Sequence, residues 1–481
     1  MSVPTVPTTP AGPGATPDAV ASFVEAHLGD LYGDLDAWLA IPSVSADPAR
    51  HADVRRGVDW LAAALRSAGF PTVEVWETAG GAGLPAVFAE WPAEEPGAPV
   101  ALLYGHSDVQ PAEPLELWET PPFTPTVRGD ELFARGAIDD KGQVLFHLLG
   151  LRAHLAATGR TSPATTLKVL VEAEEEIGSP HFAALLTERR GRLDCDVVVV
   201  SDTSCYDRDT PSMCTGMRGL VYCQIDLHGP DVDLHSGSFG GAVPNPATVL
   251  TQLVAGLHDD AGRCTLPGFY DRVVPLSDTE RELFARLPFD ADAWLRTAAS
   301  RAEAGEKGFT TLERLWARPT CEVNGLSAGW TGPGPKTIIP TDAMAKVSFR
   351  LVADQHPDEV EASLRAYVAG AVPPGISATV TSFGGVAPCL TPLDAPALQA
   401  ATRAMERAFG REILYTREGG SGPEADLATH LGAPVVFVGV GLPDDRIHAP
   451  NERVVLPMLT AGAKAAGYLW SELAATLRPQ G

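Results

Sequence analysis

Residues 166–179 read TLKVLVEAEEEIGS and join an apolar run to a cluster of acidic side chains. The run 166–171 is short and almost continuously apolar, which is typical of a strand covered on both faces in a parallel α/β sheet. It is followed directly by four glutamates, Glu172, Glu174, Glu175 and Glu176. Carboxylates crowded at the end of a buried strand repel one another and lose hydration. A bound cation would offset this charge, so the stretch indicates a metal site as well as a strand.

Three further apolar runs have the same character. They are PVALLYG (99–105), DVVVVSD (196–202) and APVVFVGVG (433–441). Stretches with helical spacing, such as 141–159, lie between the runs. Runs and helices together predict an α/β domain built on a mostly parallel sheet.

The pattern changes between about residues 216 and 385. Apolar and polar residues alternate at 219–229 and 342–352, as they do in half-exposed antiparallel strands. An amphipathic helix is predicted at 356–372. We therefore expect an α+β domain at 216–385, inserted into an α/β domain that is formed by 16–215 and 386–481.

Composition excludes several classes of protein. The 481-residue chain has 36 basic and 61 acidic residues and a net charge of −25, which argues against general binding to nucleic acid or anionic membranes. Its seven cysteines contain no CxxC pair, so neither a disulfide framework nor a thiolate zinc site is expected. Residues 1–15 lack the features of a signal peptide and are expected to form a disordered tail. No apolar run approaches the roughly 18 residues of a membrane span, and a cytoplasmic location is expected.

Residues suited to metal binding follow the apolar runs. His106 and Asp108 follow the run 99–105, Asp202 ends the run 196–202, and His448 follows the run 433–441. Asp139 opens the helical stretch that begins near residue 141. Ligands of open α/β sheets gather beyond the carboxyl ends of the strands, so these segments are expected to converge. Imidazole and carboxylate side chains are ligands that suit Zn²⁺ or Mn²⁺. Two such ions held close together need a bridging carboxylate. Asp108 is expected to orient the ring of His106.

Several longer motifs resemble those of the M20 family of metallopeptidases, particularly its dipeptidase branch of carnosinase-like and Cys-Gly dipeptidases. The motifs are YGHSDVQPA, ARGAIDDKGQ, EEIGS, SDTS, HSGSFGG, KTIIPTDAMAKVSFRLV, REGGSGP and HAPNE. They occur in the family's order over nearly the whole chain after the tail. The resemblance implies a dizinc exopeptidase catalytic domain with an inserted lid and dimerisation domain.

The resemblance also implies the ligands of two bridged divalent metals. His106, Asp139 and Asp202 would hold one ion. Asp139, Glu176 and His448 would hold the other, with Asp139 as the bridge. Zn²⁺ is the expected metal, with Mn²⁺ or Co²⁺ as alternatives. Glu175 would act as the general base for an activated water and pass its proton to the leaving amine.

Two further expectations concern the neighbours of these ligands. The peptide bond between Asp139 and Asp140 is expected to be cis. Glu172 and Glu174 receive no assigned role and are expected to be solvated or to support the residues around them.

In the inserted domain the resemblance assigns residues to the substrate. His235 would reach the active site of the partner subunit in a homodimer and stabilise the oxyanion. Arg350 would pair with the substrate's C-terminal carboxylate. Asn245, Thr337 and Ser421 lie where the family contacts its substrate.

The function implied is metal-dependent hydrolysis of dipeptides. Deacylation of N-acyl amino acids, or amidohydrolysis, on the same fold is the alternative. In the family, Asp at the position of Asp202 tends to accompany aminopeptidases and dipeptidases, which favours peptides modestly. A non-catalytic binding protein is a third hypothesis, against which the intact ligand set argues.

Single residues also have simpler interpretations. Asp139 and Asp140 could merely begin a helix, where acidic side chains favour the dipole, and Arg350 could be an exposed strand residue. The segment GWTGPGPKT (329–337) resembles a phosphate loop, but Pro335 interrupts it and no helix is predicted after it. Five other histidines are expected to be ordinary surface or packed residues, namely His147, His154, His181, His258 and His430.

Overall fold

The computed structural model describes residues 18–478, so the tail predicted at 1–15 lies outside the described residues. The chain divides into two compact units. The first unit contains the chain up to Thr215, Thr391–Thr416 and the chain from Gly422 onward. The second unit contains Gly216–Leu390 and Arg417–Ser421. Three short strands lie where the chain passes between the units: β8 (Ser212–Met217), β15 (Cys389–Leu390) and β16 (Leu414–Glu418).

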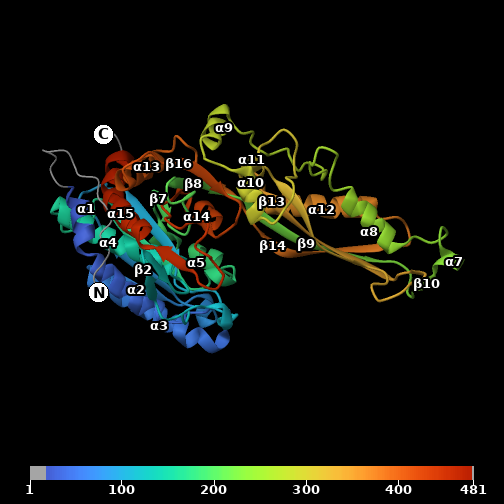
Figure 1. Cartoon of the computed structure of the whole chain (residues 1–481), viewed down its shortest axis with the longest axis horizontal. Coiled ribbons are helices and arrows are strands. Elements are labelled where there is room, and N and C mark those ends of the chain that lie inside the picture. The colour runs from blue at the N-terminus through green and yellow to red at the C-terminus, as the bar shows by residue number, and fades with distance from the viewer. Residues whose placement is uncertain (1–17, 479–481) are drawn as a thin grey trace. The chain divides into compact units, whose positions relative to one another are not determined.

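A six-stranded sheet forms the centre of the first unit (Figure 1). Its strands lie in the order β1 (Thr72–Trp76), β2 (Ala86–Trp91), β6 (Thr166–Glu172), β3 (Val100–His106), β7 (Val197–Val200) and β17 (Val435–Phe437). The four strands β6, β3, β7 and β17 are parallel, and they include all four predicted runs. The pairs β1–β2 and β2–β6 are antiparallel. The predicted mostly parallel α/β fold is confirmed.

Both faces of this sheet are covered, which explains the continuous apolar runs. In β3, Ala101 and Leu103 belong to the core shared with the long helices, while the Tyr104 ring packs against Phe182 with ring centroids 5.3 Å apart. The helices of the first unit are α1 (Ala19–Ala26), α2 (Leu28–Leu39), α3 (His51–Ala68), α4 (Lys141–Thr158), α5 (Phe182–Glu188), α6 (Arg190–Leu193), α13 (Pro396–Phe409), α14 (Glu424–Leu431) and α15 (Leu456–Leu477). A small sheet with the order β18 (Arg453–Val455), β5 (Glu131–Phe133) and β4 (Thr126–Arg128) completes the unit.

The second unit is built on a four-stranded antiparallel sheet. Its order is β11 (Thr320–Ala328), β13 (Asp342–Leu351), β9 (Gly219–His228) and β14 (Ser377–Val386). Alternate residues of β9, from Val221 to Leu227, are buried in a core shared with residues of α8 (Pro246–Ala255) and α12 (Pro357–Ala371), as the alternating pattern predicted. The remaining elements are β10 (Leu234–His235), α7 (Ser236–Phe239), α9 (Asp278–Ala285), α10 (Ala291–Thr297), α11 (Thr311–Trp316) and β12 (Ile338–Ile339).

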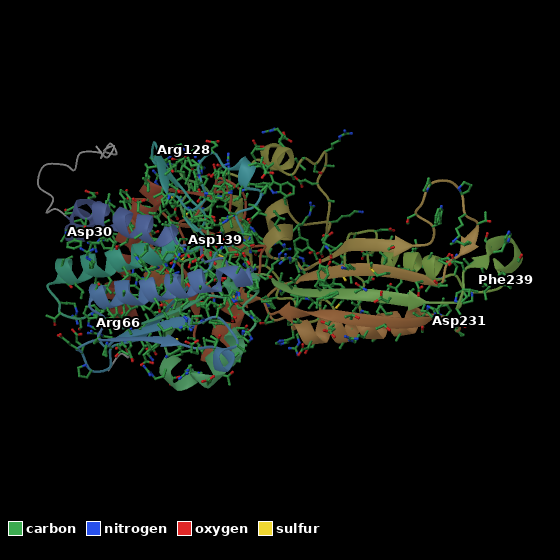
Figure 2. The ribbon with its side chains drawn as sticks, turned by 90° about the horizontal axis from the view of Figure 1, so that it is seen from below. Asp30, Arg66, Arg128, Asp139, Asp231 and Phe239 are labelled. Carbon is green, nitrogen blue, oxygen red and sulfur yellow. The ribbon has the colours of Figure 1, made fainter. Side chains whose placement is uncertain are left out.

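Side-chain packing differs between the interior of the first unit and the tip of the second. Asp139 lies among crowded side chains of the first unit, whereas Asp231 and Phe239 lie at one end of the second unit's sheet (Figure 2). All seven cysteines lie within residues 18–478 and none forms a disulfide. No helix in this part of the chain has both the length and the apolar character needed to span a membrane.

The close packing of α4 on α15 yields a stability prediction. A Cβ added at Gly150 would lie 2.5 Å from the Ala466 Cβ and 2.7 Å from the Ala463 carbonyl oxygen. Gly33 in α2 has no atom within 4 Å of its Cβ position. We expect Gly150→Ala to lower the free energy of unfolding by roughly 1–3 kcal/mol through overpacking. Gly33→Ala should raise it by about 0.5–1 kcal/mol, because alanine favours the helix.

The measurement is the urea midpoint of each variant against the wild type, followed by circular dichroism. Both substitutions add a methyl group to a helical glycine. Opposite changes in the free energy of unfolding would therefore isolate the effect of the contact between α4 and α15. A midpoint for Gly150→Ala at or above the wild-type value would contradict the packing described for α4 and α15.

Candidate metal centre

The ends of neighbouring parallel strands bring the site together. His106 ends β3 and pairs in register with Glu172, which ends β6. The Ser107 N–H donates to the Glu172 carbonyl at 2.8 Å and continues this ladder beyond the strands. β7 pairs with the other side of β3 and is followed by Asp202. Histidine and carboxylates from three strands therefore share one edge of the sheet, as the pattern predicted.

Asp139 lies at the middle of this group, with one histidine on each carboxylate oxygen. The His106 Nε2 atom is 2.9 Å from Asp139 Oδ1, and the His448 Nε2 atom is 2.9 Å from Asp139 Oδ2. Asp202 Oδ2 lies 3.5 Å from His106 Nε2, and Glu176 Oε2 lies 3.1 Å from His448 Nε2. The five predicted ligands thus lie together, although they come from five separate segments.

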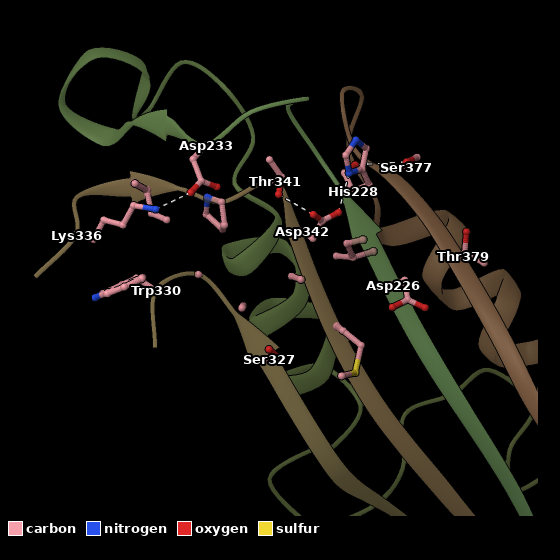
Figure 3. A pocket seen from close by; sticks show the side chains of 17 residues that line it. Asp226, His228, Asp233, Ser327, Trp330, Lys336, Thr341, Asp342, Ser377 and Thr379 are labelled. Carbon is pink, nitrogen blue, oxygen red and sulfur yellow. Dashed lines mark hydrogen bonds and ion pairs between the residues drawn. The ribbon is translucent and has the colours of Figure 1, made fainter. Parts of the chain in front are cut away.

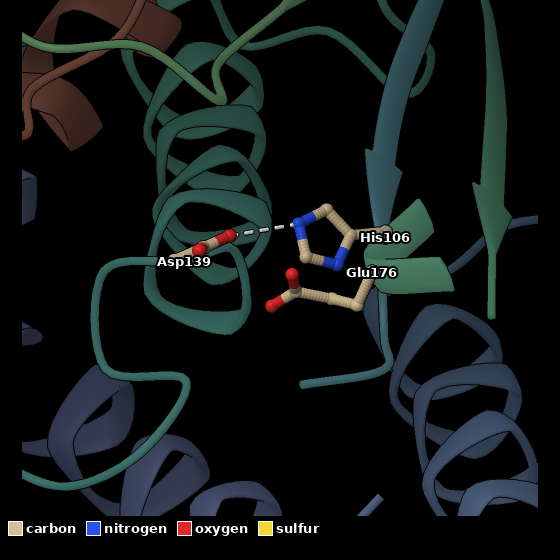
Figure 4. Close-up of side chains that lie close together, drawn as sticks. All are labelled: His106, Asp139 and Glu176. Carbon is tan, nitrogen blue, oxygen red and sulfur yellow. Dashed lines mark hydrogen bonds and ion pairs between the residues drawn. The ribbon is translucent and has the colours of Figure 1, made fainter. Parts of the chain in front are cut away.

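Three of these side chains can offer one donor atom each to a single ion. His106, Asp139 and Glu176 each offer one atom, and the three atoms lie within 4.8 Å of one another (Figure 4). Asp202 extends the group on the His106 side and His448 extends it on the Glu176 side. Nitrogen and oxygen donors at these spacings fit a divalent cation such as Zn²⁺ or Mn²⁺.

Asp108 orients the His106 ring through two of its atoms. His106 Nδ1 lies 3.1 Å from the Asp108 carbonyl oxygen and 3.4 Å from its carboxylate Oδ1. An oxygen facing Nδ1 keeps the proton on that nitrogen and leaves Nε2 as the atom available to a metal. The other carboxylate oxygen of Asp108 accepts the Glu176 N–H at 3.1 Å. Asp108 therefore ties two predicted ligands to each other.

Asp140 anchors the main chain of His106. The Asp139–Asp140 peptide bond is cis, as expected. Asp140 Oδ2 accepts the His106 N–H at 3.2 Å. A Cβ at Gly105 would lie 2.5 Å from this oxygen, so only glycine lets Asp140 approach the end of β3.

The four glutamates of the stretch 166–179 divide into two pairs. Glu175 and Glu176 form a single 3₁₀ turn, Glu175–Ile177, at the edge of the sheet. Glu172 and Glu174 are both buried rather than solvated. Glu172 accepts the Tyr104 hydroxyl at 2.8 Å and the Ser179 hydroxyl at 2.9 Å. Glu174 accepts the Leu84 N–H at 2.9 Å, and its other oxygen lies 2.9 Å from His181 Nδ1. Glu172 and Glu174 therefore support the residues around them, which is one of the two roles expected from the sequence.

Gln110 is a supporting residue to which the sequence reasoning gave no role. Its main-chain N–H donates to Glu176 Oε1 at 3.0 Å, and its side-chain Nε2 donates to Glu176 Oε2 at 2.8 Å. Gln110 belongs to the quoted motif YGHSDVQPA, but a polar residue after a strand gives no sign of its partner. Only the folded chain brings it to Glu176.

Burial and mutual repulsion give the acidic cluster a high affinity for protons. Burial, reinforced by the charges of Asp202 and Glu176, raises the pKa of Glu175 to about 9 against the opposing effect of His106. Burial also raises the pKa of Asp202 and that of Glu176, with Asp139 adding to both. Hydrogen bonds to Asp139 and Glu176 raise the pKa of His448 to about 10. The cluster therefore holds protons that a divalent cation would displace.

The predicted substrate residues all lie in the second unit. Arg350 Nη1 donates to the Ser421 hydroxyl at 3.0 Å, so these two residues meet. The Thr337 carbonyl accepts the Ser236 N–H at 3.0 Å, beside the exposed His235.

Asn245 and His235 also have local hydrogen bonds. Asn245 caps α8, because its Oδ1 accepts the Ala247 N–H at 2.9 Å. His235 Nδ1 accepts the Gly237 N–H at 3.0 Å. Capping alone gives Asn245 a structural role. For all five residues of the second unit, contact with a substrate stays a prediction.

Arg218 lies next to Arg350 and was missed by the sequence reasoning. The Ser421 hydroxyl donates to the Arg218 carbonyl at 2.6 Å, and Arg218 Nε donates to the Gly419 carbonyl at 3.3 Å. Burial, together with the positive charge of Arg350, lowers the pKa of Arg218 to about 10. Two neighbouring guanidinium groups, one of them buried, favour an anion beside them. A lone Arg in the stretch MRGL carries no sequence signal for this arrangement.

A polar pocket of about 510 Å³ lies within the second unit and contains no predicted metal ligand (Figure 3). His228 Nδ1 lies 2.7 Å from Asp342 Oδ1, and Lys336 Nζ donates to Asp233 Oδ2 at 2.9 Å. These ion pairs are exposed and internally balanced, so the pocket has a less distinctive chemistry than the cluster around Asp139.

Comparison with known proteins gives relatives that align along nearly their whole length. The Beta-Ala-His dipeptidase of Homo sapiens is 28% identical over 480 residues, which cover 97% of this chain and 94% of that protein. The Cys-Gly metallodipeptidase DUG1 of Candida albicans is 29% identical over 450 residues, with 90% and 92% covered. Among solved structures, the M20 family metallo-carboxypeptidase Sso-CP2 of Sulfolobus solfataricus has a TM-score of 0.79 and 28% identity, and covers 93% of this chain and 99% of its own.

The family model described as Peptidase family M20/M25/M40 matches residues 102–472, from β3 to α15. This range spans well over half of the chain and includes every predicted ligand. The resemblance inferred from the motifs is thereby confirmed, and the chain belongs to peptidase family M20/M25/M40.

Proposed function

We propose that this protein is a dipeptidase that depends on two divalent metal ions. One observation carries the proposal: the two oxygens of Asp139 face different histidines, each at 2.9 Å. A carboxylate that presents one oxygen to each of two donor groups has the arrangement of a bridging ligand. The two relatives, a Beta-Ala-His dipeptidase and a Cys-Gly metallodipeptidase, support a dipeptide as the substrate.

The donor atoms divide naturally into two sets around Asp139. His106 and Asp202 would complete the set at Oδ1, and Glu176 and His448 would complete the set at Oδ2. When ionised, the carboxylates of Asp139, Glu175, Glu176 and Asp202 carry four negative charges, which two divalent cations balance. Zn²⁺ suits these ligands best, with Mn²⁺ and Co²⁺ as alternatives.

When bound, such ions act as Lewis acids that activate water and polarise the carbonyl of the scissile bond. Glu175 is the residue we assign to proton transfer. Its carboxylate takes a proton from the attacking water and delivers it to the nitrogen of the leaving amine. Burial and the neighbouring carboxylates raise the pKa of Glu175, and the positive charge of bound ions would lower it, which would leave the carboxylate able to accept the proton.

The second unit supplies residues to which we assign substrate recognition. Arg350 and its neighbour Arg218 would bind the C-terminal carboxylate of the dipeptide, because guanidinium groups recognise carboxylates through paired hydrogen bonds. The Ser421 hydroxyl accepts a hydrogen bond from the Arg350 guanidinium and donates one to the Arg218 main-chain carbonyl, so it would hold the Arg350 side chain beside Arg218. Thr337 and Asn245 are assigned further substrate contacts. His235 is exposed, and we assign it the stabilisation of the oxyanion in the partner subunit of a homodimer.

A substrate panel tests the proposed reaction. Metal-reconstituted protein should hydrolyse Cys-Gly or β-Ala-His with kcat/KM at least about tenfold above that for N-acetyl amino acids, because peptide binding contributes to transition-state stabilisation. The amide of the same dipeptide lacks the carboxylate that Arg350 would bind, and its KM should rise about tenfold or more.

Arg350→Gln should remove the difference in KM between the free dipeptide and its amide. Amine release, followed with a fluorogenic reagent, measures all of these rates. Faster turnover of N-acetyl amino acids than of any dipeptide would favour the deacylase alternative over this proposal.

Replacing Glu175 tests the assignment of proton transfer. Glu175→Gln keeps the shape of the side chain but cannot accept the proton, so kcat should fall by about 10²–10⁴-fold. The matched control is Glu174→Gln, one residue earlier, which changes the same group at a carboxylate that contacts Leu84 and His181. Bound metal, measured by mass spectrometry, should be unchanged in both variants. Normal turnover by Glu175→Gln would remove Glu175 from the mechanism.

The same variant tests the role of His235 in the partner subunit. Glu175→Gln and His235→Ala are each expected to be nearly inactive as pure homodimers. In mixed dimers, one site would combine an intact Glu175 with an intact His235 of the partner, so re-equilibrated mixtures should recover about a quarter of wild-type activity. No recovery in a mixture whose dimers have exchanged subunits would contradict the assignment of His235.

Proton release gives a test that does not require turnover. The pKa of Glu175, raised to about 9, and that of His448, raised to about 10, mean that the metal-free cluster binds protons near neutral pH. A metal must displace these protons, so metal affinity should increase as pH rises from 6 to 8, by roughly tenfold per pH unit for each proton released. Calorimetry of Mn²⁺ binding in buffers of different ionisation enthalpy counts the protons. Affinity that does not change with pH would contradict the cluster as the binding site.

A further inference from the structure

The carboxylate of Glu452 is fully buried and accepts four hydrogen bonds in the first unit. Oε2 accepts the Gly136 N–H at 3.0 Å and an Arg135 Nη1 proton at 2.7 Å. Oε1 accepts the Ile138 N–H at 3.2 Å and the Asp139 N–H at 3.3 Å. The loop that carries Asp139 is therefore wrapped around one carboxylate, which holds the main chain of Asp139 itself.

The loop needs this carboxylate because of its shape. Three N–H groups of residues 136–139 point to the same side, where a helix or strand partner would normally accept them. Gly136 has a φ of 82°, a conformation that glycine adopts without strain, and a Cβ there would lie 2.7 Å from Val109 Cγ1. Glu452 gathers the N–H groups that this turn leaves without a main-chain acceptor.

Arg135 balances the charge of Glu452 and is itself held in place. Its side chain is also buried, its Nη2 donates to the Pro111 carbonyl at 3.1 Å, and its guanidinium lies 5.5 Å from the centre of the Trp118 ring. A buried ion pair with this many partners has little freedom to move. The position of the Glu452 carboxylate is thus set from both sides.

Glu452 also connects the two histidine sides of the cluster. It lies four residues after His448, whose φ of 60° is uncommon for a residue other than glycine. The intervening Asn451 fixes this segment, because its Oδ1 accepts the Glu119 N–H and its Nδ2 donates to the Leu117 carbonyl, both at 2.8 Å. One short segment therefore carries a ligand and, four residues later, the group that holds Asp139.

The carboxylate is not needed to join the two segments. Strands β18 and β5 already pair them, with Arg453 opposite Phe133 and Val454 opposite Leu132. The Glu452 carbonyl additionally accepts the Ala134 N–H at 3.1 Å. The hydrogen bonds that the Glu452 carboxylate adds are made with residues 135–139, and the last of these residues is the predicted ligand Asp139.

From this geometry we infer that Glu452 is a positioning residue for the metal centre: it directs the Asp139 carboxylate so that one oxygen faces His106 and the other faces His448. The inference rests on the proposed function, in which Asp139 bridges two ions. By fixing the main chain at Asp139, Glu452 sets the direction of the Cα–Cβ bond and hence the reach of both oxygens. Residues that orient metal ligands in this way strengthen metal binding without touching the metal.

The test is Mn²⁺ binding by metal-free full-length protein, measured by isothermal titration calorimetry. Glu452→Gln removes the charge and turns one acceptor into a donor facing Arg135 and Gly136, so Mn²⁺ should bind about 10- to 100-fold more weakly. The matched control is Glu306→Gln in the second unit. Glu306 is likewise buried and accepts two hydrogen bonds from Arg318, at 2.7 and 2.8 Å. The control should leave the affinity for Mn²⁺ at the wild-type value.

Two further variants make each outcome decisive. If Glu452→Gln does not yield folded protein, Glu452→Asp keeps the charge but is one methylene shorter, and it should weaken Mn²⁺ binding for the same reason. Wild-type affinity in whichever Glu452 variant folds overturns the inference. Asp139→Asn separates this result from a failure of the proposed function. Lost binding in Asp139→Asn with normal binding in the Glu452 variant rejects only the positioning role. Normal binding in Asp139→Asn rejects the bridging ligand and the inference with it.

Discussion

Carboxylates buried together at one edge of a parallel sheet repel one another, and the site exists only where that repulsion is offset. Burial and the neighbouring charge of Asp139 raise the pKa of both Glu176 and Asp202. His106 and His448 offset part of the charge by contacting Asp139 from opposite sides. Two divalent cations would offset this negative charge fully. The carboxylates that repel one another in the absence of metal would therefore favour metal binding.

Neighbouring groups hold each ligand of this cluster in position. Asp108 faces Nδ1 of His106 and leaves Nε2 available. Gln110 fixes Glu176, and Glu452 fixes the main chain of Asp139. These contacts come from strand ends and short loops at the edge of the six-stranded sheet, and they limit the freedom of the ligands to move.

The second unit has a different organisation. Arg350 lies on a central strand, and its contact with Ser421 links it to a segment, Arg417–Ser421, that is distant in sequence. His235 lies on the exposed two-residue strand β10. A fixed pair of arginines suits the recognition of one end of a small substrate, whereas an exposed histidine suits contact with another molecule. The two parts of this unit thus fit the two different roles that we propose for them.

The parallel sheet, its covered faces and the approximate strand ends were determined by sequence alone, because continuous apolar runs and the polar residues after them report burial directly. The motifs also identified the family, and with it His106, Asp139, Glu175, Glu176, Asp202 and His448 as candidates. The cap of Glu452 on residues 136–139, the hold of Gln110 on Glu176 and the pairing of Arg218 with Arg350 were decided only by tertiary structure. Local patterns could not predict them, since each joins segments whose spacing in the chain carries no information about their distance in space.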